Sequence, residues 1–195
     1  MRPVIWLMDR FGVPDALVGD LVERQDRQPS RLRFWRQTVG AILNAVRRDV
    51  LGHGALAVRA LLVGWTLHWL VVQCRQPVMW MSAGWAWKAN LWLTRSLGVY
   101  IPVPFLVVEF VGALAIGWTV SRLHRPHGMA MVLVYLATVL VFYLGGFFNS
   151  LPRGVAAFGF VDLAVNALFP FVVVPMAVIG GGLVSVLPRL GSRVT

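Results

Sequence analysis

Four long apolar stretches, at about residues 55–74, 101–120, 129–148 and 163–187, constrain this chain more than any other feature. A helix needs about 20 mostly apolar residues to cross a bilayer, and each stretch is long enough. The only charged side chains within them are Arg59, one turn into the first stretch, and Glu109 in the second. The sequence therefore predicts an all-α membrane protein with four transmembrane helices over residues 53–195, preceded by a helical region over residues 1–52.

Composition and charge agree with a membrane location. Hydrophobic residues make up 58% of the chain and charged residues only 13%, whereas about a quarter of a soluble domain is charged. Fourteen of the 18 basic residues lie before or at the start of the first stretch, between the second and third, or after the fourth. Basic residues near membrane helices stay on the cytoplasmic side. This distribution therefore predicts that both termini are cytoplasmic. Because it also accounts for the net charge of +10, we expect no nucleic-acid partner.

The first 52 residues are expected to form three helices. Gly12 and Pro14 end the first, the second covers about residues 15–28, and the third, capped by Ser30, runs to about residue 51. Six apolar residues of the third helix recur at steps of three and four, which predicts one apolar face. They are Leu32, Trp35, Val39, Ile42, Val46 and Val50. We expect the amino-terminal half of this face to pack on the second helix and its other end to lie on the membrane surface.

Residues 18–24 (VGDLVER) and 31–37 (RLRFWRQ) together resemble a known family. Over about residues 9–45 the chain is similar to the permease prefix domain, which precedes bacterial macrolide-exporter-type permeases and occurs in small bacterial membrane proteins. The chain has fewer acids after Asp20, and it carries neither a large periplasmic domain nor a glycine-rich nucleotide-binding loop. The resemblance implies a bacterial inner (cytoplasmic) membrane protein with a small cytosolic interaction module. We assign its interaction surface to Asp20, Glu23, Trp35 and Arg36.

Tryptophans mark the segment between the first two apolar stretches, at residues 76–99. Trp80, Trp85, Trp87 and Trp92 alternate there with polar and basic residues. Tryptophan rings prefer the membrane interface, where the ring is buried and the N–H stays hydrated. We therefore expect a helix that lies on the outer leaflet and is anchored by these rings. A tryptophan platform that binds carbohydrate or another ligand is the less favoured alternative.

Glu109 is the main candidate for a functional residue, because an ionisable group inside a membrane helix costs at least about 2.5 kcal/mol to insert. It lies near the middle of the second apolar stretch. One interpretation is a proton or cation site. The other, which we favour because no second acid lies in the apolar stretches, is a protonated glutamic acid bonded to a polar residue of another helix. The available partners are His68, Tyr143, Asn149 and Asn166.

Neither the cysteine nor the histidines predict a metal site. Cys74 is the only cysteine, so an intrachain disulfide or a cysteine-based metal site is excluded. His124 and His127 have a spacing that suits one metal ion, but Pro126 separates them and basic residues flank them. We expect an ordinary basic loop there, with no metal and no cofactor.

Small residues and prolines predict how the apolar helices pack. Two pairs of small residues four apart, Ala60 with Gly64 and Ala113 with Gly117, favour close packing of the first helix on the second. In the fourth stretch two prolines are followed by three consecutive glycines at residues 180–182. This pattern predicts a helix that is kinked near its middle and loose near its end.

No group of residues that carries catalytic chemistry is evident, because paired acids and matched Ser-His or Cys-His sets are missing from the apolar stretches. We therefore expect a protein that is not an enzyme. The first hypothesis is an accessory or regulatory subunit that assembles in the lipid bilayer with a bacterial permease, another membrane protein or copies of itself. The alternative is a small transporter or channel that uses Glu109 and the broken fourth helix.

Overall fold

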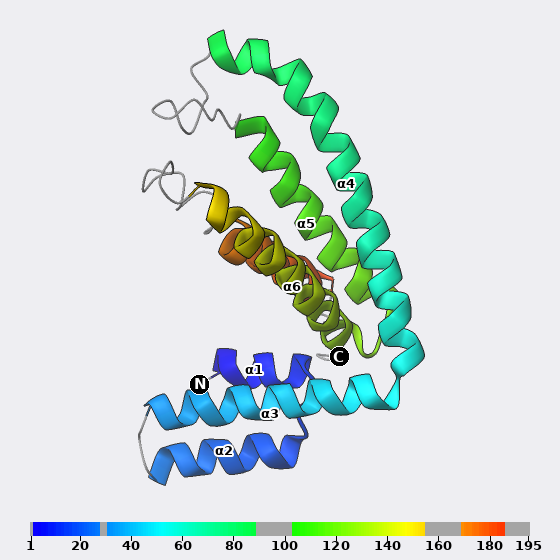
Figure 1. The fold of residues 1–195 in the computed structure, drawn as a ribbon. Coiled ribbons are helices and arrows are strands. Elements are labelled where there is room, and N and C mark those ends of the chain that lie inside the picture. Colours follow the sequence, from blue (N-terminus) through cyan, green and yellow to red (C-terminus); the bar gives the residue numbers. More distant parts are fainter. Residues whose placement is uncertain (1, 28–30, 89–102, 155–168, 186–195) are drawn as a thin grey trace, which may run out of the picture.

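The computed structural model describes residues 2–27, 31–88, 103–154 and 169–185, and this part of the chain folds into helices (Figure 1). Three amino-terminal helices, α1 (Arg2–Arg10), α2 (Asp15–Arg27) and α3 (Arg31–Gly52), precede the long helices α4 (Gly54–Lys88), α5 (Val103–Leu123) and α6 (Gly128–Gly154). A π-helical turn, η1 (Phe169–Val173), leads into α8 (Val174–Val184). The predicted all-α fold class is confirmed.

The amino-terminal helices α1, α2 and α3 form a module with a core of its own. Five of its apolar side chains are buried together, namely Met8, Val13, Val18, Leu21 and Ala45. A second, larger core lies among α4, α5, α6 and α8, which we call the bundle. The structure therefore has two hydrophobic cores, one on either side of the junction between α3 and α4.

Gly12 ends α1, as the sequence predicts. Its φ of 68° lies in the left-handed region, which glycine enters without the steric cost that a Cβ imposes. The Gly12 N–H donates to the Asp9 carbonyl and the Val13 N–H to the Met8 carbonyl, both at 3.1 Å. These bonds satisfy two carbonyls at the helix end, in the arrangement of a Schellman motif. Because Met8 and Val13 belong to the same core, the turn also directs the chain into α2.

A single residue, His53, separates α3 from α4, and the chain turns sharply there (Figure 1). Gly52 and Gly54 flank it. We call residues 52–54 the elbow. α3 lies across the foot of the bundle, whereas α4 rises away from it. The sequence predicts that the third helix ends at about residue 51, which agrees with the end of α3 at Gly52.

Three helices are long and apolar enough to cross a membrane, over Gly54–Val78 in α4, Leu106–Leu123 in α5 and Gly128–Gly146 in α6. α4 leads away from the amino-terminal module, α5 returns to it and α6 leads away again (Figure 1). Of the fourth predicted span, residues 163–187, the structure describes residues 169–185, in which Phe169–Val184 form a shorter apolar helical segment. Residues 163–168 and 186–187 lie outside the described part of the chain.

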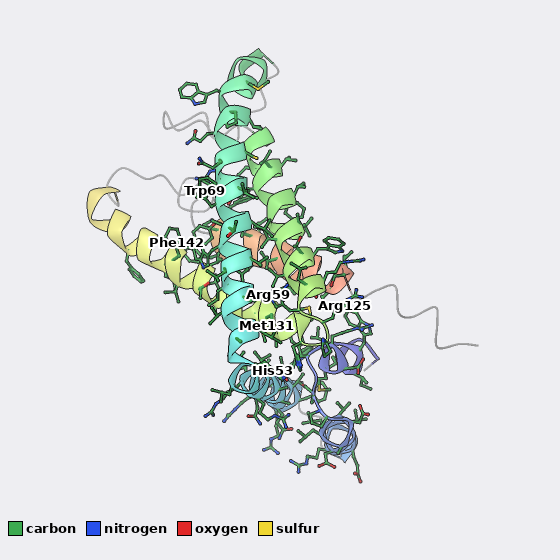
Figure 2. All side chains as sticks on the ribbon, turned by 90° about the vertical axis from the view of Figure 1, so that its right-hand side faces the viewer. His53, Arg59, Trp69, Arg125, Met131 and Phe142 are labelled. Carbon is green, nitrogen blue, oxygen red and sulfur yellow. The ribbon has the colours of Figure 1, made fainter. Side chains whose placement is uncertain are left out.

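The outer surface of the bundle is apolar. Trp69 of α4 and Phe142 of α6 are 59% and 60% exposed, whereas Met131 of α6 is fully buried; all three are labelled in Figure 2. Apolar side chains of this size are costly to expose to water. Such an outer surface suits lipid, in agreement with the membrane-capable length of these helices.

α4 continues through Pro77 as one helix to Lys88. The segment that the sequence predicts as a separate interfacial helix, residues 76–99, is therefore an extension of α4 as far as Lys88. Residues 89–99 lie outside the described part. Among the four predicted tryptophan anchors, Trp80 is 75% exposed, and the side chains of the other three lie outside the described part. Their anchoring role stays a prediction.

α5 and α8 touch through their backbones. A Cβ added at Gly117 would lie 2.7 Å from the carbonyl carbon of Val178, and one at Gly181 would lie 2.8 Å from that of Leu114. Both distances are shorter than any side chain tolerates against backbone atoms. The expectation of a loose glycine-rich end in the fourth stretch is therefore wrong, because these glycines form the closest helix contact of the bundle's described residues.

The small-residue pairs do not join α4 to α5 as predicted. Gly64 of α4 lies against the ring of Tyr135 in α6, where an added Cβ would be 2.7 Å from the Tyr135 Cε2 atom. Gly117 of α5 faces α8. Contact between α4 and α5 instead involves Gly112, which lies against Val71. The small residues were correctly expected to allow close approach, but the sequence does not specify the partner helix.

α8 runs parallel to α5. Gly117 lies beside Val178, and further along both helices Ser185 Oγ donates to Ser121 Oγ at 2.7 Å. The chain therefore returns to the module end of the bundle at Ser185. The π-helical turn η1 precedes α8, and a proline lies in the first turn of α8, where the missing N–H costs no hydrogen bond. This irregular start agrees with the predicted kink.

Candidate functional site

A partly buried ion pair links α4 to α5. Arg75 Nη1 lies 3.2 Å from Glu109 Oε2, close enough for a charge-assisted hydrogen bond. The Glu109 side chain is 7% exposed, whereas that of Arg75 is 31% exposed. A buried carboxylate is tolerated only when it is paired and hydrogen-bonded, and Arg75 supplies that partner from the neighbouring helix.

A tyrosine and a histidine extend this group to α6. The Tyr143 hydroxyl donates to Glu109 Oε1 at 3.4 Å, a long hydrogen bond. The Tyr143 ring meets His68 of α4 edge-on, with centroids 6.3 Å apart. His68 Nδ1 in turn lies 3.4 Å from the hydroxyl of Tyr135. We call Arg75, Glu109, Tyr143, His68 and Tyr135 the polar clasp, because together they connect α4, α5 and α6.

The charged part of the polar clasp lies toward one end of the bundle. Arg75, Glu109 and Tyr143 are each three residues from an end of the apolar segment of their own helix, at Val78, Leu106 and Gly146 respectively. These ends lie far from the amino-terminal module (Figure 1). Glu109 is therefore nearer the end of its helix than its place in the second apolar stretch suggests.

The polar clasp is chemically suited to connecting helices. Both oxygens of Glu109 have a partner, one a guanidinium and the other a hydroxyl. Within the described parts of α4, α5 and α6, Glu109 is the only carboxylate, so these helices hold no second acid for a proton relay. The favoured interpretation was a protonated glutamic acid bonded to another helix. Tyr143 supplies the expected bond from another helix, but the main partner of Glu109 is Arg75, a cation that this interpretation did not include, and the protonated form stays a prediction.

Sequence reasoning identified Tyr143 and missed Arg75. Arg75 lies just beyond the first apolar stretch, so its basic charge points to a loop rather than to a partner for Glu109. One signal was available. Two consecutive antiparallel helices place two residues at the same depth when each residue is equally far from the end at which its helix meets the connection to the other helix. Arg75 and Glu109 meet this condition, because they are three residues from Val78 and Leu106 respectively. Of the other proposed partners, His68 joins the polar clasp, and the side chains of Asn149 and Asn166 lie outside the described part.

The four residues predicted as an interaction surface are all exposed. Asp20 and Glu23 lie on α2, and Trp35 and Arg36 lie on α3. Arg36 also lines a shallow depression on α3, together with Leu32, Arg33 and Gln37. Exposure is necessary for a binding surface, but it does not identify what binds, so this assignment stays a prediction.

α3 carries two apolar faces, and the face that the sequence predicts as its contact with α2 reaches the core of the module only through Ile42. The face against α1 and α2 holds Phe34, Ala41, Ile42 and Ala45. The other face is open, with Leu32, Trp35, Val39 and Leu43 exposed. Val50, at the elbow end of α3, packs against the core of the bundle. We call Leu32, Trp35, Val39 and Leu43 the open stripe.

A group of potential metal ligands lies at the elbow. One side-chain ligand atom each from Asp49, His53 and His127 lies within 4.8 Å of the other two. His124, which the sequence pairs with His127, is instead buried, and its Nδ1 lies 2.8 Å from the Val120 carbonyl oxygen. Sequence reasoning missed this group because its members come from distant parts of the chain that only the fold brings together.

No family model, curated protein or solved structure matches this chain. The resemblance of residues 9–45 to the permease prefix domain therefore stays a prediction. The open stripe, the polar clasp and the elbow are the three candidate sites in the described part of the chain.

Proposed function

We propose that this chain is a non-enzymatic protein of the bacterial inner membrane that assembles with another membrane protein through its amino-terminal module. The open stripe carries the proposal. Leu32, Trp35, Val39 and Leu43 are 82%, 50%, 50% and 59% exposed on one side of α3. A row of large apolar side chains that the described residues leave uncovered is typical of a binding surface.

The residues around the open stripe indicate the chemistry of the partner. Arg36 lies beside Leu32 in the depression on α3. Arginine provides a planar set of donors that fits carboxylates, and its stem adds apolar contact. The expected partner is therefore an apolar helix that carries acidic side chains, docked along α3 close to the membrane.

The path of the bundle supports the proposed orientation, with both termini in the cytoplasm. α5 returns to the module end of the bundle, and α8, parallel to α5, also ends there at Ser185, beside Ser121. Most basic residues of the chain are in segments at this same end. An excess of basic residues is retained on the cytoplasmic side.

The transport alternative receives less support from the geometry. Glu109 is bonded to Arg75 and Tyr143 near one end of the helices, whereas a relay or transport site needs a carboxyl that exchanges its partner. The test is proton-linked flux in reconstituted vesicles. Flux that disappears in a Glu109→Gln variant would favour transport over the assembly proposal.

The assembly proposal is tested by recovering the partner from native membranes. The tagged full-length chain is extracted in mild detergent, and proteins recovered at near-stoichiometric yield are identified. A Trp35→Ser, Val39→Ser double variant should lower recovery of the partner about tenfold or more, since buried aromatic anchors dominate interface energies. Leu17→Ser is the matched control, because Leu17 is a 41% exposed leucine on α2 outside the open stripe.

Two results would contradict the assembly proposal. One is unchanged recovery of the same partner by the double variant that has lost the open stripe. The other is recovery of the chain alone. Equal amounts of each variant in the membrane fraction show that insertion is intact, so a loss of the partner can be assigned to the open stripe.

A further inference from the structure

The elbow brings together three side chains that can bind a metal ion. Asp49 comes from the last turn of α3, His53 is the single residue between α3 and α4, and His127 immediately precedes α6. Their ligand atoms lie within 4.8 Å of one another. Two imidazole nitrogens and one carboxylate oxygen are a donor set that zinc and neighbouring divalent transition metals accept.

Two of these atoms already have the spacing of ligands on one ion. His127 Nδ1 lies 3.2 Å from Asp49 Oδ2. Metal bonds of about 2.0–2.2 Å to nitrogen and oxygen, at angles between a right angle and a tetrahedral angle, separate two ligand atoms by about 3.0–3.5 Å. The His53 ring lies against the His127 ring, with centroids 4.1 Å apart, so the third potential ligand is next to the other two.

A backbone carbonyl orients the His53 ring and selects the tautomer that a metal ligand needs. His53 Nδ1 lies 3.1 Å from the Asp49 carbonyl oxygen, which only accepts hydrogen bonds, so Nδ1 carries the hydrogen. Nε2 of the neutral ring then has a free lone pair. Histidines that bind metals usually donate their second ring nitrogen to a carbonyl or carboxylate in this way, which fixes the orientation of the ring.

The surroundings allow a cation to enter. The Asp49 and His127 side chains are 30% and 22% exposed, so water can complete the coordination of an ion. The basic residue two positions before His127, Arg125, donates from Nη2 to the Ser185 carbonyl at the end of α8. In Figure 2, His53 lies at the foot of α4 and Arg125 is displaced from it toward α8. The charge of Arg125 is therefore held away from the three ligands.

We propose that Asp49, His53 and His127 form a binding site for a divalent transition-metal cation of the zinc type, with water as the remaining ligand. The ion connects α3, the elbow and the turn between α5 and α6. It therefore fixes the angle between the amino-terminal module and the bundle. This proposal is independent of what the open stripe binds.

The test uses the full-length protein, purified in mild detergent and stripped with a chelator. Zn²⁺ is then titrated in competition with a chromophoric indicator. We expect one high-affinity ion per chain, and a loss of affinity of about tenfold or more in His53→Ala, His127→Ala and Asp49→Asn, since even residues that only orient metal ligands contribute this much. His68→Gln and Asp20→Asn are the controls, because they remove a histidine and an acid outside the site.

Thermal unfolding provides a second measurement on the same samples. Zn²⁺ should raise the Tm of the unmodified protein, because an ion that binds only the folded state stabilises it. It should leave the Tm of His53→Ala unchanged. His53 is exposed, so this variant should fold normally without the ion.

Clear outcomes would overturn the metal proposal. These are the absence of Zn²⁺ binding by the unmodified protein, or binding that His53→Ala and Asp49→Asn retain in full. An equal loss of affinity in the His68→Gln control would also overturn it, since the bound ion would then not depend on the elbow.

Discussion

The amino-terminal module and the bundle are held together in different ways. In the module, ordinary apolar side chains such as Met8 and Leu21 meet in a core between amphipathic helices. In the bundle, α5 and α8 touch through backbone at Gly117 and Gly181, and a partly buried ion pair joins α4 to α5. Apolar burial drives packing in water, but lipid is as apolar as leucine, so membrane helices depend on close approach and polar contacts. The contrast indicates that the two regions face different solvents.

The strongest test of this contrast is a Gly181→Ala substitution. The new methyl group would collide with the backbone of α5 at Leu114, and overpacking against atoms that cannot move costs about 3 kcal/mol. Unfolding by SDS, followed by circular dichroism, measures the change in stability. Gly180→Ala is the matched control, because the nearest atom to a Cβ there is a Leu114 side-chain carbon at 3.6 Å. Equal effects of the two substitutions would show that α5 and α8 are not in backbone contact.

A second, smaller effect is expected for Arg75→Gln. Removing one member of a buried ion pair leaves the other without its partner, and we expect a loss of about 2 kcal/mol because Arg75 is partly exposed. The stability of the Arg75→Gln, Glu109→Gln double variant completes a double-mutant cycle. The double variant should lose less stability than the two single variants lose in sum. Strictly additive losses would mean that Arg75 and Glu109 do not interact. The bundle would then differ from the module only in its close backbone contacts.

The smallest effect is expected in the module, for Gly12→Ala. Here glycine is needed for its φ of 68° rather than for space, since the nearest atom to an added Cβ is an Asp49 oxygen at 4.0 Å. A left-handed conformation costs alanine about 1 kcal/mol. Asparagine adopts it more readily, so Gly12→Asn should retain more of the stability. Hydrogen exchange of the amides in α1 measures both variants, and an equal loss of protection would contradict a conformational cause.

Features that depend on neighbouring residues in the chain could be predicted from the sequence. Hydrophobic stretches indicated the all-α class and the membrane-capable helices. Gly12 with Pro14 marked the end of α1, and the start of the first apolar stretch at about residue 55 marked the beginning of α4 to within a residue. In each case a local rule of backbone conformation or solvent preference decides the outcome.

Features that depend on which helices become neighbours could not be predicted in the same way. The glycines of α8 were expected to loosen its end, but α5 uses them for contact. Trp35 and Val39 were expected to pack on α2, but the opposite part of α3 does so. Helical periodicity identifies an apolar face without identifying what covers it. The grouping of Asp49 with His127 depends on the same information about helix arrangement.

The position of the elbow at one end of α3 means that a small rotation there produces a large displacement at the other end. α3 contains 22 residues, so at 1.5 Å per residue it extends about 33 Å from the joint. A rotation of about 10° at His53 would carry the far end of α3 through about 6 Å, and α1 and α2 would move with it. Any change of backbone conformation at His53 would therefore displace Leu32 and Trp35 several times further than the atoms at the elbow.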